Sequence, residues 1–450
     1  MGRYFGTDGI RGPVDGPHIN PGFVKQVGQG YARYLKSTCS EPYLVVIGRD
    51  PRPSGEWMAA MLADAMTEAG FQVMDTGMVP TPVVAKAVHE KNAAGGIVLT
   101  ASHNPASDNG IKLFARGGTK YTATEEATIE DLIEAARVED SMSRSLSRDL
   151  TNPGFLDLYC DALVGMFKPT LLNGLRLGLD TANGATRVTS PRVFQALGAD
   201  LFHLGDDPDG SRINQACGSE HPEELKAAVQ SNNLHLGLAH DGDGDRLVCV
   251  DETGHRVDGD QLMGMIALDG IRQGWMNKQT LVTTIQSNMG LDAAIQQAGG
   301  TVLRVGIGDR NVAEKMRETG ASFGGENSGH LIFGNDATTG DGLLAALRIL
   351  EIIQQDERPF SERLSEIPLY PQRTQSLRVS EKRPIESCEA LLEAMAIWNS
   401  RLEGKGRLLV RYSGTEAKLR LLAEADSADL ADSALDALVT ASQKDLEVLG

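Results

Sequence analysis

The sequence has few cysteines for its length, and none of them forms a paired motif. Five cysteines are spread over 450 residues, and no CxxC pair occurs. This spacing predicts neither a structural zinc site nor a disulfide framework. We therefore expect reduced thiols in a cytosolic protein.

Long apolar runs are also missing. A membrane-spanning helix needs about 18 or more consecutive apolar residues, and no stretch approaches that length. The opening residues, MGRYFGTDGIRG, lack the apolar core of a secretory signal. These absences predict a cytoplasmic protein with no membrane partner.

Basic residues are in the minority. The chain carries 43 Lys and Arg against 61 Asp and Glu, a formal net charge of −18. Such a chain repels nucleic acid and anionic membranes at long range, so we expect neither as a partner. It would also repel a phosphorylated substrate, so any anion site must be a local cluster of arginines and backbone amides.

The length is too great for one ordinary core and predicts several domains. Strand and helix alternate in three successive series, and a shorter mixed series follows, which predicts three α/β domains and a smaller α+β domain. The polar, serine-rich stretch 136–154 fits no periodic pattern and suggests the first boundary. The predicted domains are 1–150, 151–255, 256–367 and 368–450.

Several elements follow from local patterns. Buried strands are expected at 43–47, 96–99, 175–180, 234–240, 280–285, 322–324 and 407–411. Helices are expected at 56–70, at 390–402 and at 429–449. One further helix is expected to begin at 259, and another, after the strand at 280–285, to end near 296. Ser54 is a candidate N-cap and Gly70 a candidate end signal for the helix at 56–70.

The polar sequence TASHNP, residues 100–105, directly follows a predicted buried strand. A serine in such a turn, here Ser102, is either a nucleophile or phosphoryl carrier, or simply a residue that caps a turn. His103 and Lys112 are polar groups nearby, and Asn109-Gly110 forces a turn between them. Their presence favours chemistry at Ser102.

The sequence DGDGDR, residues 241–246, also follows a predicted strand. Asp241, Asp243 and Asp245 alternate, so their side chains face one side of an extended loop. Three converging carboxylates suit a hard cation such as Mg²⁺ or Ca²⁺ and would repel one another without it. A solvated acidic loop is the plain alternative.

An EF-hand begins with a similar pattern, and Glu252 falls at its twelfth position. However, the sixth position holds Arg246 instead of glycine, and strands instead of helices are expected on both sides. We therefore expect an open magnesium site.

Two further polar loops follow strands. In GENSGH, residues 325–330, Glu326 offers acceptors for sugar hydroxyls and His330 offers a donor. In RYSGTE, residues 411–416, a glycine turn, two hydroxyls and Arg411, together with Arg420, are typical of a phosphate cradle. Simple turns are the alternative at each place. A hydroxyl, a cation site, a sugar loop and a phosphate loop together form a complete set for moving phosphate on a sugar.

Together, these four loops resemble those of the α-D-phosphohexomutases, and the resemblance extends over essentially the whole chain. RYFGTDGIRG at the start, NQACGSE at 214–220 and TTGDG at 338–342 are similar to the bacterial subgroup that acts on glucosamine phosphates. Asn327 stands where glutamine is commoner in that subgroup, and Ala417 where proline is frequent.

The resemblance implies three similar mixed-sheet α/β domains and a smaller fourth around a central cleft. It implies conversion of glucosamine 6-phosphate to glucosamine 1-phosphate for UDP-N-acetylglucosamine and cell-wall synthesis, through a phosphoserine and a 1,6-bisphosphate. It further implies a homodimer.

The resemblance also assigns roles to residues. Ser102 would carry the phosphoryl group, Lys112 would be the acid/base, and Arg11 and His330 would assist. One Mg²⁺ per chain would be held by Asp241, Asp243, Asp245 and the phosphate on Ser102. The residues expected to bind substrate are Arg246, Glu326, Asn327, Ser328, Arg411, Ser413, Gly414, Thr415 and Arg420.

Three other functions stay open on the sequence. A phosphomannomutase/phosphoglucomutase would use the same parts. A phosphohydrolase would transfer the phosphoryl group to water and would not need a second phosphate loop. A sugar-phosphate sensor would not need a phosphorylatable serine.

Overall fold

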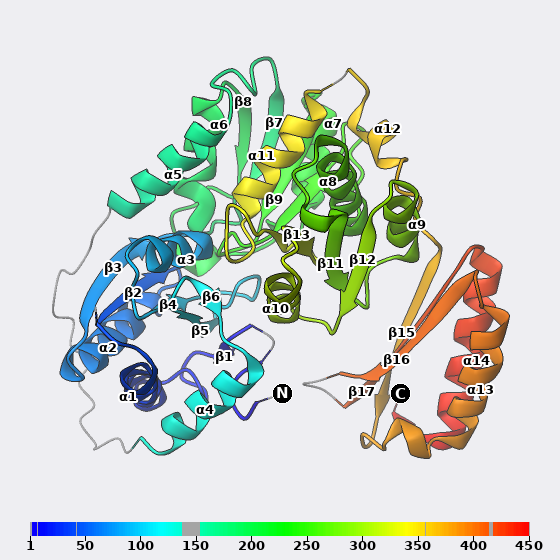
Figure 1. Ribbon diagram of the computed structural model, residues 1–450, viewed down its shortest axis with the longest axis horizontal. Coiled ribbons are helices and arrows are strands. Elements are labelled where there is room, and N and C mark those ends of the chain that lie inside the picture. The colour runs from blue at the N-terminus through cyan, green and yellow to red at the C-terminus, as the bar shows by residue number, and fades with distance from the viewer. Residues whose placement is uncertain are drawn as a thin grey trace. The chain divides into compact units, whose positions relative to one another are not determined.

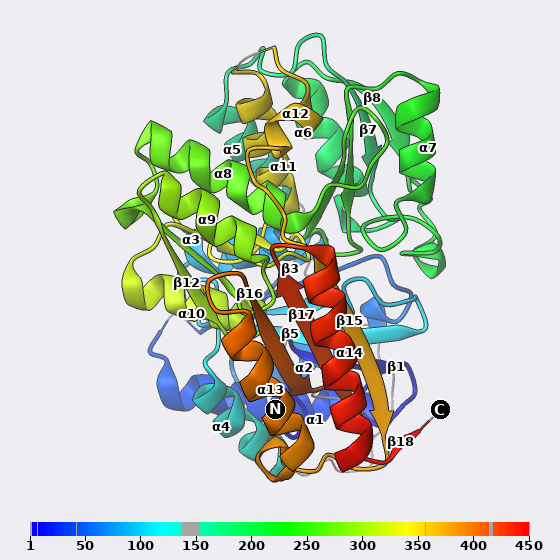
Figure 2. The same ribbon diagram turned by 90° about the vertical axis from the view of Figure 1, so that its right-hand side faces the viewer.

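The computed structural model describes residues 2–6, 8–41, 43–136, 154–355, 357–413 and 417–449. The chain forms two compact units. Unit 1 comprises Met1–Ile285 and Gly299–Ser365, and unit 2 comprises Gln286–Ala298 and Glu366–Gly450. Figures 1 and 2 show the two units from directions 90° apart.

The first sheet of unit 1 is built from the N-terminal part of the chain. Its strands are β1 (Ile10–Pro13), β2 (Leu44–Arg49), β3 (Gln72–Met78), β4 (Gly95–Leu99), β5 (Asp108–Ala115) and β6 (Thr119–Lys120). They lie in the order β1-β5-β4-β2-β3, with β6 beside β5. The helices are α1 (Pro21–Thr38), α2 (Gly55–Glu68), α3 (Thr81–Glu90) and α4 (Ala123–Glu134).

The second and third sheets follow in order. The second contains β7 (Arg176–Asp180), β8 (Asp200–Leu204), β9 (Leu236–His240) and β10 (Leu247–Val250), with α5 (Gly154–Met166), α6 (Ser190–Ala196) and α7 (Glu223–Ser231). The third contains β11 (Thr280–Thr284), β12 (Thr301–Val305), β13 (Phe323–Gly325) and β14 (Leu331–Phe333), with α8 (Gly259–Gln273), α10 (Asp309–Thr319), α11 (Gly342–Ile353) and α12 (Phe360–Leu364).

One strand order recurs in the three sheets of unit 1. Each sheet contains a series of four strands in chain order: β2 to β5, β7 to β10, and β11 to β14. The first strand of each series pairs in parallel with the second and the third, and the third pairs with the antiparallel fourth. The connections from third to fourth strand are β4 to β5, β9 to β10, and β13 to β14. These connections carry TASHNP, DGDGDR and GENSGH. The three polar loops of unit 1 therefore occupy one topological position, repeated three times.

Unit 2 is a four-stranded antiparallel sheet in its described part. Its strands are β15 (Gln372–Val379), β16 (Gly406–Tyr412), β17 (Lys418–Ala425) and β18 (Val448–Leu449), in the order β16-β17-β15-β18. Its helices are α9 (Met289–Gln297), α13 (Glu389–Arg401) and α14 (Ala428–Asp445). Both α13 and α14 lie on one face of the sheet (Figures 1 and 2), where Leu419 and Leu421 are buried. Arg420, between these leucines, lies on the opposite face because side chains alternate along a strand.

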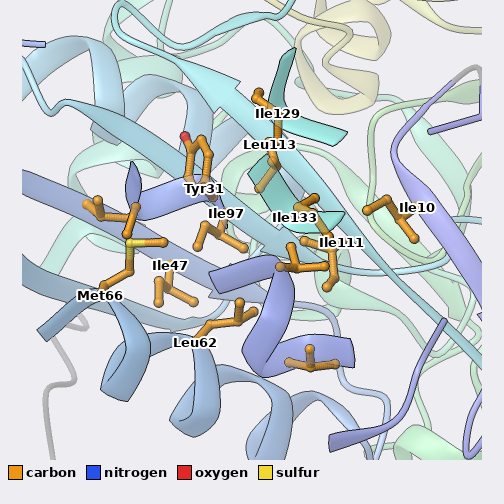
Figure 3. Close-up of a cluster of buried hydrophobic side chains, with 14 of the residues drawn as sticks. Ile10, Tyr31, Ile47, Leu62, Met66, Ile97, Ile111, Leu113, Ile129 and Ile133 are labelled. Atoms are coloured by element: carbon orange, nitrogen blue, oxygen red, sulfur yellow. The ribbon is translucent and has the colours of Figure 1, made fainter. Parts of the chain in front are cut away.

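A large core cluster packs against the first sheet of unit 1. Tyr31 of α1 and Leu62 of α2 meet Ile47 and Ile97 of the central strands, and all four side chains are almost completely buried (Figure 3). The other face of the same strands is covered by α3, where a methyl group at Gly96 would lie 2.5 Å from Val88. This two-sided burial explains why β2 and β4 are nearly continuous apolar runs.

The observed elements confirm most local predictions. Gly70 follows the end of α2 with φ +84°, as its role as an end signal requires. Ser54 is not a side-chain cap, because its hydroxyl accepts a hydrogen bond from Asn109 instead. The final helix ends at Asp445, so the expected extension to 449 is wrong, since Val448–Leu449 pairs with β15. The stretch 137–153, with the proposed first boundary, lies outside the described residues.

Candidate active site

Ser102 lies in the turn after β4, completely buried and next to the acidic loop. Its hydroxyl donates a hydrogen bond to Asp241 Oδ2 at 2.5 Å, and its Oγ lies 3.3 Å from His103 Nδ1. Its φ of +53° is in the left-handed region, which is uncommon for any residue but glycine. Such a conformation persists only where the surroundings enforce it.

A buried arginine provides that enforcement. Arg52 pairs with Asp50 at 2.9 Å, and neither side chain is exposed. Its guanidinium donates to the carbonyl oxygens of Ser102 at 3.0 Å and Asn104 at 2.7 Å. Thr100 completes the arrangement: its hydroxyl donates to Asp50 and accepts from the backbone N–H of Ser102. The loop after β4 is therefore held in place by buried hydrogen bonds from Arg52 and Thr100.

The three aspartates of DGDGDR converge as the sequence predicts. Carboxylate oxygens of Asp241, Asp243 and Asp245 all lie within 4.8 Å of one another, and the three side chains are buried. Among the described residues, Asp243 Oδ1 and Asp245 Oδ1 have no hydrogen-bond partner. Burial, together with the neighbouring carboxylates of Asp245 and Asp243, raises the pKa of Asp241. Buried carboxylate oxygens that lie close together, two of them without a hydrogen bond, fit a hard divalent cation. The flanking β9 and β10 are strands, which confirms that this is no EF-hand.

Lys112 projects from β5 into this acidic cluster. Its ammonium lies 2.8 Å from Asp243 Oδ2, 2.8 Å from Asp245 Oδ2 and 2.7 Å from Asp8 Oδ2. Burial alone would lower the pKa of Lys112, but the three carboxylates hold it well above its usual value. Lys112 is thus protonated at neutral pH, and it binds Oδ2 of Asp243 and of Asp245, whereas Oδ1 of each carboxylate has no hydrogen bond among the described residues.

Asp8 is a site residue that local pattern reasoning missed. It accepts from Lys112, from Arg11 at 2.5 Å, and from Lys120, which also pairs with Asp309. Burial raises the pKa of Asp8, but these cations hold it well below its usual range. The available signal was the opening GTDG sequence, whose aspartate precedes Arg11. Arg11 therefore lies at the same cluster as Lys112.

His330 joins the sugar loop to the acidic loop. Its Nδ1 lies 3.6 Å from Asp245 Oδ1, and its Nε2 lies 3.3 Å from Asp309 Oδ2. Burial lowers the pKa of His330, but the carboxylates of Asp245 and Asp309 outweigh it and raise the pKa overall. Glu326 is fixed by the backbone N–H of Gly308, which donates to its Oε1 at 2.9 Å.

Three other predicted substrate residues lie around these loops. Arg246 donates its backbone N–H to Asp241 Oδ1 at 3.2 Å, and its side chain lies 4.0 Å from Glu220. Asn327 is exposed and Ser328 is half-buried. Unit 1 therefore brings together the predicted residues of the serine, metal and sugar loops.

The predicted phosphate loop belongs to unit 2. Arg411 of β16 lies directly opposite Arg420 of β17. Both line a pocket of about 180 Å³, with Ser376 beside them, on the sheet face away from α13 and α14. Burial and the neighbouring charge of Arg420 lower the pKa of Arg411. Two opposed cations are suited to an anion. Ser413 is buried, while Gly414 and Thr415 lie outside the described residues.

Comparison with known proteins gives the family. Residues 2–139, 157–254 and 258–370 match the phosphoglucomutase/phosphomannomutase alpha/beta/alpha domains I, II and III, and residues 376–441 match the C-terminal domain of that family. A phosphoglucosamine mutase from Geotalea daltonii is 40% identical over 429 residues, 94% of each chain. The chain belongs to the phosphoglucomutase/phosphomannomutase family, the α-D-phosphohexomutases.

Other phosphohexomutases extend this similarity. A phosphoglucosamine mutase from Geobacter sp. (strain M21) is 39% identical over 99% of this chain and 98% of its own. A phosphoglucomutase/phosphomannomutase family protein from Burkholderia thailandensis has a TM-score of 0.82 at 26% identity, with both chains fully covered. The N-acetylphosphoglucosamine mutase of Aspergillus fumigatus, solved with GlcNAc-6P and magnesium, has a TM-score of 0.68 at 19% identity over 99% of this chain and 96% of its own. The chain is thus an enzyme with the phosphohexomutase fold.

Proposed function

We propose that this phosphohexomutase interconverts glucosamine 6-phosphate and glucosamine 1-phosphate through a phosphoserine at Ser102 and a glucosamine 1,6-bisphosphate intermediate. The observation that carries the mechanism is the 2.5 Å hydrogen bond between Ser102 and the acidic triad. The choice of sugar rests on the relatives named phosphoglucosamine mutase, which are about 40% identical over nearly their whole length. The product would feed the synthesis of UDP-N-acetylglucosamine and the cell wall.

The cation proposed for the triad is one Mg²⁺ per chain, because carboxylate oxygens are its preferred ligands. Asp241, Asp243 and Asp245 would hold it, with an oxygen of the phosphate on Ser102. When bound, the ion neutralises charge on the phosphoryl group during transfer. Lys112 contributes a second, fixed positive charge by binding Asp243 and Asp245 from the other side.

In the first half-reaction the 1-hydroxyl of glucosamine 6-phosphate attacks the phosphorus atom on Ser102. A new O1–P bond forms, and the P–Oγ bond to Ser102 breaks. One proton passes in net terms from the attacking hydroxyl to Ser102 Oγ. Lys112, which is protonated in this arrangement, is the proposed proton carrier, and Arg11 and His330 assist it.

The bisphosphate then reorients so that its 6-phosphate faces Ser102, and Ser102 Oγ attacks the 6-phosphorus. The Oγ–P bond re-forms, the O6–P bond breaks, and the proton of the Ser102 hydroxyl passes in net terms to O6, so that glucosamine 1-phosphate leaves. The transition state of phosphoryl transfer is loose, so positioning and charge neutralisation supply most of the catalysis. Arg411, Ser413, Gly414, Thr415 and Arg420 would bind the phosphate that is not being transferred, while Arg246, Glu326, Asn327 and Ser328 would bind the sugar.

Phosphomannomutase/phosphoglucomutase activity is the second candidate, because the family matched by all four segments carries those names. Turnover of the 6-phosphates of glucosamine, glucose and mannose, measured side by side with the same enzyme preparation, separates the two. We expect the highest kcat/KM for glucosamine 6-phosphate. Faster turnover of either other sugar would make the second candidate correct.

The phosphoserine has its own test. Peptide mass spectrometry of the purified chain should find one phosphoryl group, on Ser102, and Ser102→Ala should lose most activity. An active preparation with phosphate elsewhere or nowhere would refute the mechanism. A homodimer, which the family resemblance implies, and a cytoplasmic location, which the sequence composition suggests, also stay predictions.

A further inference from the structure

The segment Thr338–Gly342, which follows β14 and ends at the first residue of α11, contacts several separate parts of unit 1 through successive residues. The hydroxyl of Thr338 donates to the carbonyl oxygen of Gly118, in the turn between β5 and β6, at 2.5 Å. The next contacts reach the sugar loop, α5 and the metal loop. None of these residues is among the catalytic or binding residues described above.

Gly342 lies directly behind the metal loop. Its backbone N–H donates to the carbonyl oxygen of Gly244 at 3.0 Å. A methyl group at Gly342 would lie 2.2 Å from the carbonyl oxygen of Arg246 and 2.8 Å from His240 Nδ1. These two atoms are themselves 3.2 Å apart and close the loop at its two ends. Any side chain at position 342 would therefore push the carbonyl group of Arg246, which follows Asp245, and the ring of His240.

Gly340 has the same relation to the sugar loop. Its backbone N–H donates to His330 Nε2 at 3.0 Å, and a methyl group there would lie 2.4 Å from that nitrogen. Because Nε2 accepts from Gly340, the ring is held in one orientation, with Nδ1 toward Asp245. A side chain at position 340 would displace the imidazole and would reach the metal loop only through the contact of that ring with Asp245.

Asp341, between the two glycines, anchors the segment. It is buried, and its Oδ1 accepts from the backbone N–H of Leu344 at 3.0 Å, which caps α11. The hydroxyl of Tyr159 on α5 lies 2.9 Å from each carboxylate oxygen of Asp341. The two glycines are thus held between a helix start and a buried tyrosine.

We propose that Gly340, Asp341 and Gly342 are positioning residues: Gly342 sets the geometry of the metal loop, Gly340 sets the orientation of His330, and Asp341 with Tyr159 holds both in place. This inference rests on the proposed function, because it assigns a task to the same metal and sugar loops. Groups that orient the ligands of a site commonly change affinity or activity by about 10–100-fold when they are altered.

The test uses the full chain with Gly342→Ala, Gly340→Ala and the control Gly165→Ala, whose added methyl group meets no atom within 4 Å. Mg²⁺ binding is measured by calorimetry, and kcat and KM are measured at saturating Mg²⁺. Gly342→Ala should weaken Mg²⁺ binding at least about tenfold. Gly340→Ala should lower kcat about tenfold or more and weaken Mg²⁺ binding by a smaller factor than Gly342→Ala does. Gly165→Ala should change neither.

Tyr159→Phe covers the case in which a glycine variant fails to fold, since it removes only one hydroxyl. It should weaken Mg²⁺ binding and lower kcat together, by smaller factors than the glycine variants. If the wild-type chain binds Mg²⁺ and Gly342→Ala or Tyr159→Phe binds it equally well, this inference is wrong and the proposed function stands. If the wild-type chain does not bind Mg²⁺, the proposed metal site is wrong and this inference falls with it.

Discussion

The guanidinium of Arg52 donates a hydrogen bond to the carbonyl oxygen of Ser102 at 3.0 Å, from a position with no exposed side-chain surface. It also donates to the carbonyl oxygens of Asn104, Pro105 and Asp108. One side chain therefore donates to four backbone carbonyls of the segment that follows β4. Only a planar group with several donors does this, so lysine is not an equivalent replacement.

Arg52→Lys should therefore lose activity through the geometry of Ser102. The carbonyls of Ser102 and Asn104 keep a second donor in Asn214, and that of Pro105 keeps the backbone N–H of Asp108. The guanidinium hydrogen bonds are still lost, and each hydrogen bond to a charged group is worth about 1.5–3 kcal/mol, so the thermal midpoint should fall as well. We expect kcat to drop about tenfold or more. Arg176→Lys, at an exposed pair with Asp200, is the control and should behave as wild type. Unchanged kcat in Arg52→Lys would show that Ser102 holds its conformation without the arginine.

The sequence was sufficient for much of this site because each loop directly follows an apolar strand. The alternation of Asp241, Asp243 and Asp245 predicts their convergence, and the structure confirms it. The buried strands at 96–99 and 234–240 were predicted to within two residues at each end. Short-range patterns were enough because these loops are fixed by the strands that they follow.

What the sequence could not show are contacts between distant residues. Asp8 and Lys112 are 104 positions apart in the sequence, and the antiparallel pairing of β1 with β5 brings them into contact. Neither strand has the sequence pattern of a simple buried run, so this pairing was not predicted. Arg52 stands in a loop that reads only as a connection between β2 and α2. Its role depends on burial beneath another loop, which periodicity does not encode. The final helix was overextended because apolar spacing continues past Asp445 into a short strand.

Removal of the cation should destabilise the protein as well as stop turnover. A ligand at a hundredfold excess over its Kd stabilises the folded state by about 2.7 kcal/mol, so Mg²⁺ should raise the thermal midpoint of the wild type. Asp243→Asn should lose most of this rise, and the exposed control Asp200→Asn should keep it. Ca²⁺ should also raise the midpoint but support little turnover, because its coordination geometry is looser. Full activity after exhaustive chelation would refute the metal site.

The pair of Arg411 and Arg420 should lower the stability of unit 2 and strengthen the binding of phosphate. Like charges directly opposite on neighbouring strands cost roughly 0.2–1 kcal/mol, so Arg411→Met should slightly stabilise unit 2 without phosphate. The same variant should raise KM about tenfold or more, since a hydrogen bond to a charged group is worth about 1.5–3 kcal/mol. Inorganic phosphate should raise the thermal midpoint of the wild type but not that of Arg411→Met. Arg373→Met, at an exposed pair with Asp432, serves as the control. An unchanged KM in Arg411→Met would mean that the pair is only structural.

Asp341 should make stability depend on pH. Burial raises its pKa from 3.8 to about 6 in the folded chain. Between those values the folded state binds more protons than the unfolded state, so the free energy of unfolding falls as pH rises. The loss is complete above pH 6 and amounts to about 3 kcal/mol. Asp341→Asn, which keeps the helix cap, should gain stability relative to wild type from pH 4 to 6.5 in thermal melts. Parallel pH curves for the two proteins would contradict this.

The preference for an amino sugar should depend in part on the exposed side chain of Asn327. Glucosamine carries an ammonium at C2 where glucose carries a hydroxyl, and an ammonium has three donors and no acceptor. Asn327 offers an amide oxygen in the sugar loop, whereas methionine offers only a weak thioether acceptor. Asn327→Met should therefore lower kcat/KM for glucosamine 6-phosphate more than for glucose 6-phosphate. A hydrogen bond to a charged group is worth about 1.5–3 kcal/mol, so the ratio should shift by about one to two orders of magnitude.

Glu326→Ala is the matched comparison for that experiment. Glu326 is anchored by Gly308 and would hold hydroxyl groups that both sugars share. Its removal should lower kcat/KM for both substrates by similar factors and leave their ratio nearly unchanged. If Asn327→Met leaves the ratio unchanged as well, the amide does not contact C2. Selectivity would then have to arise from groups that contact the sugar outside the GENSGH loop, and the mutase mechanism at Ser102 would be unaffected.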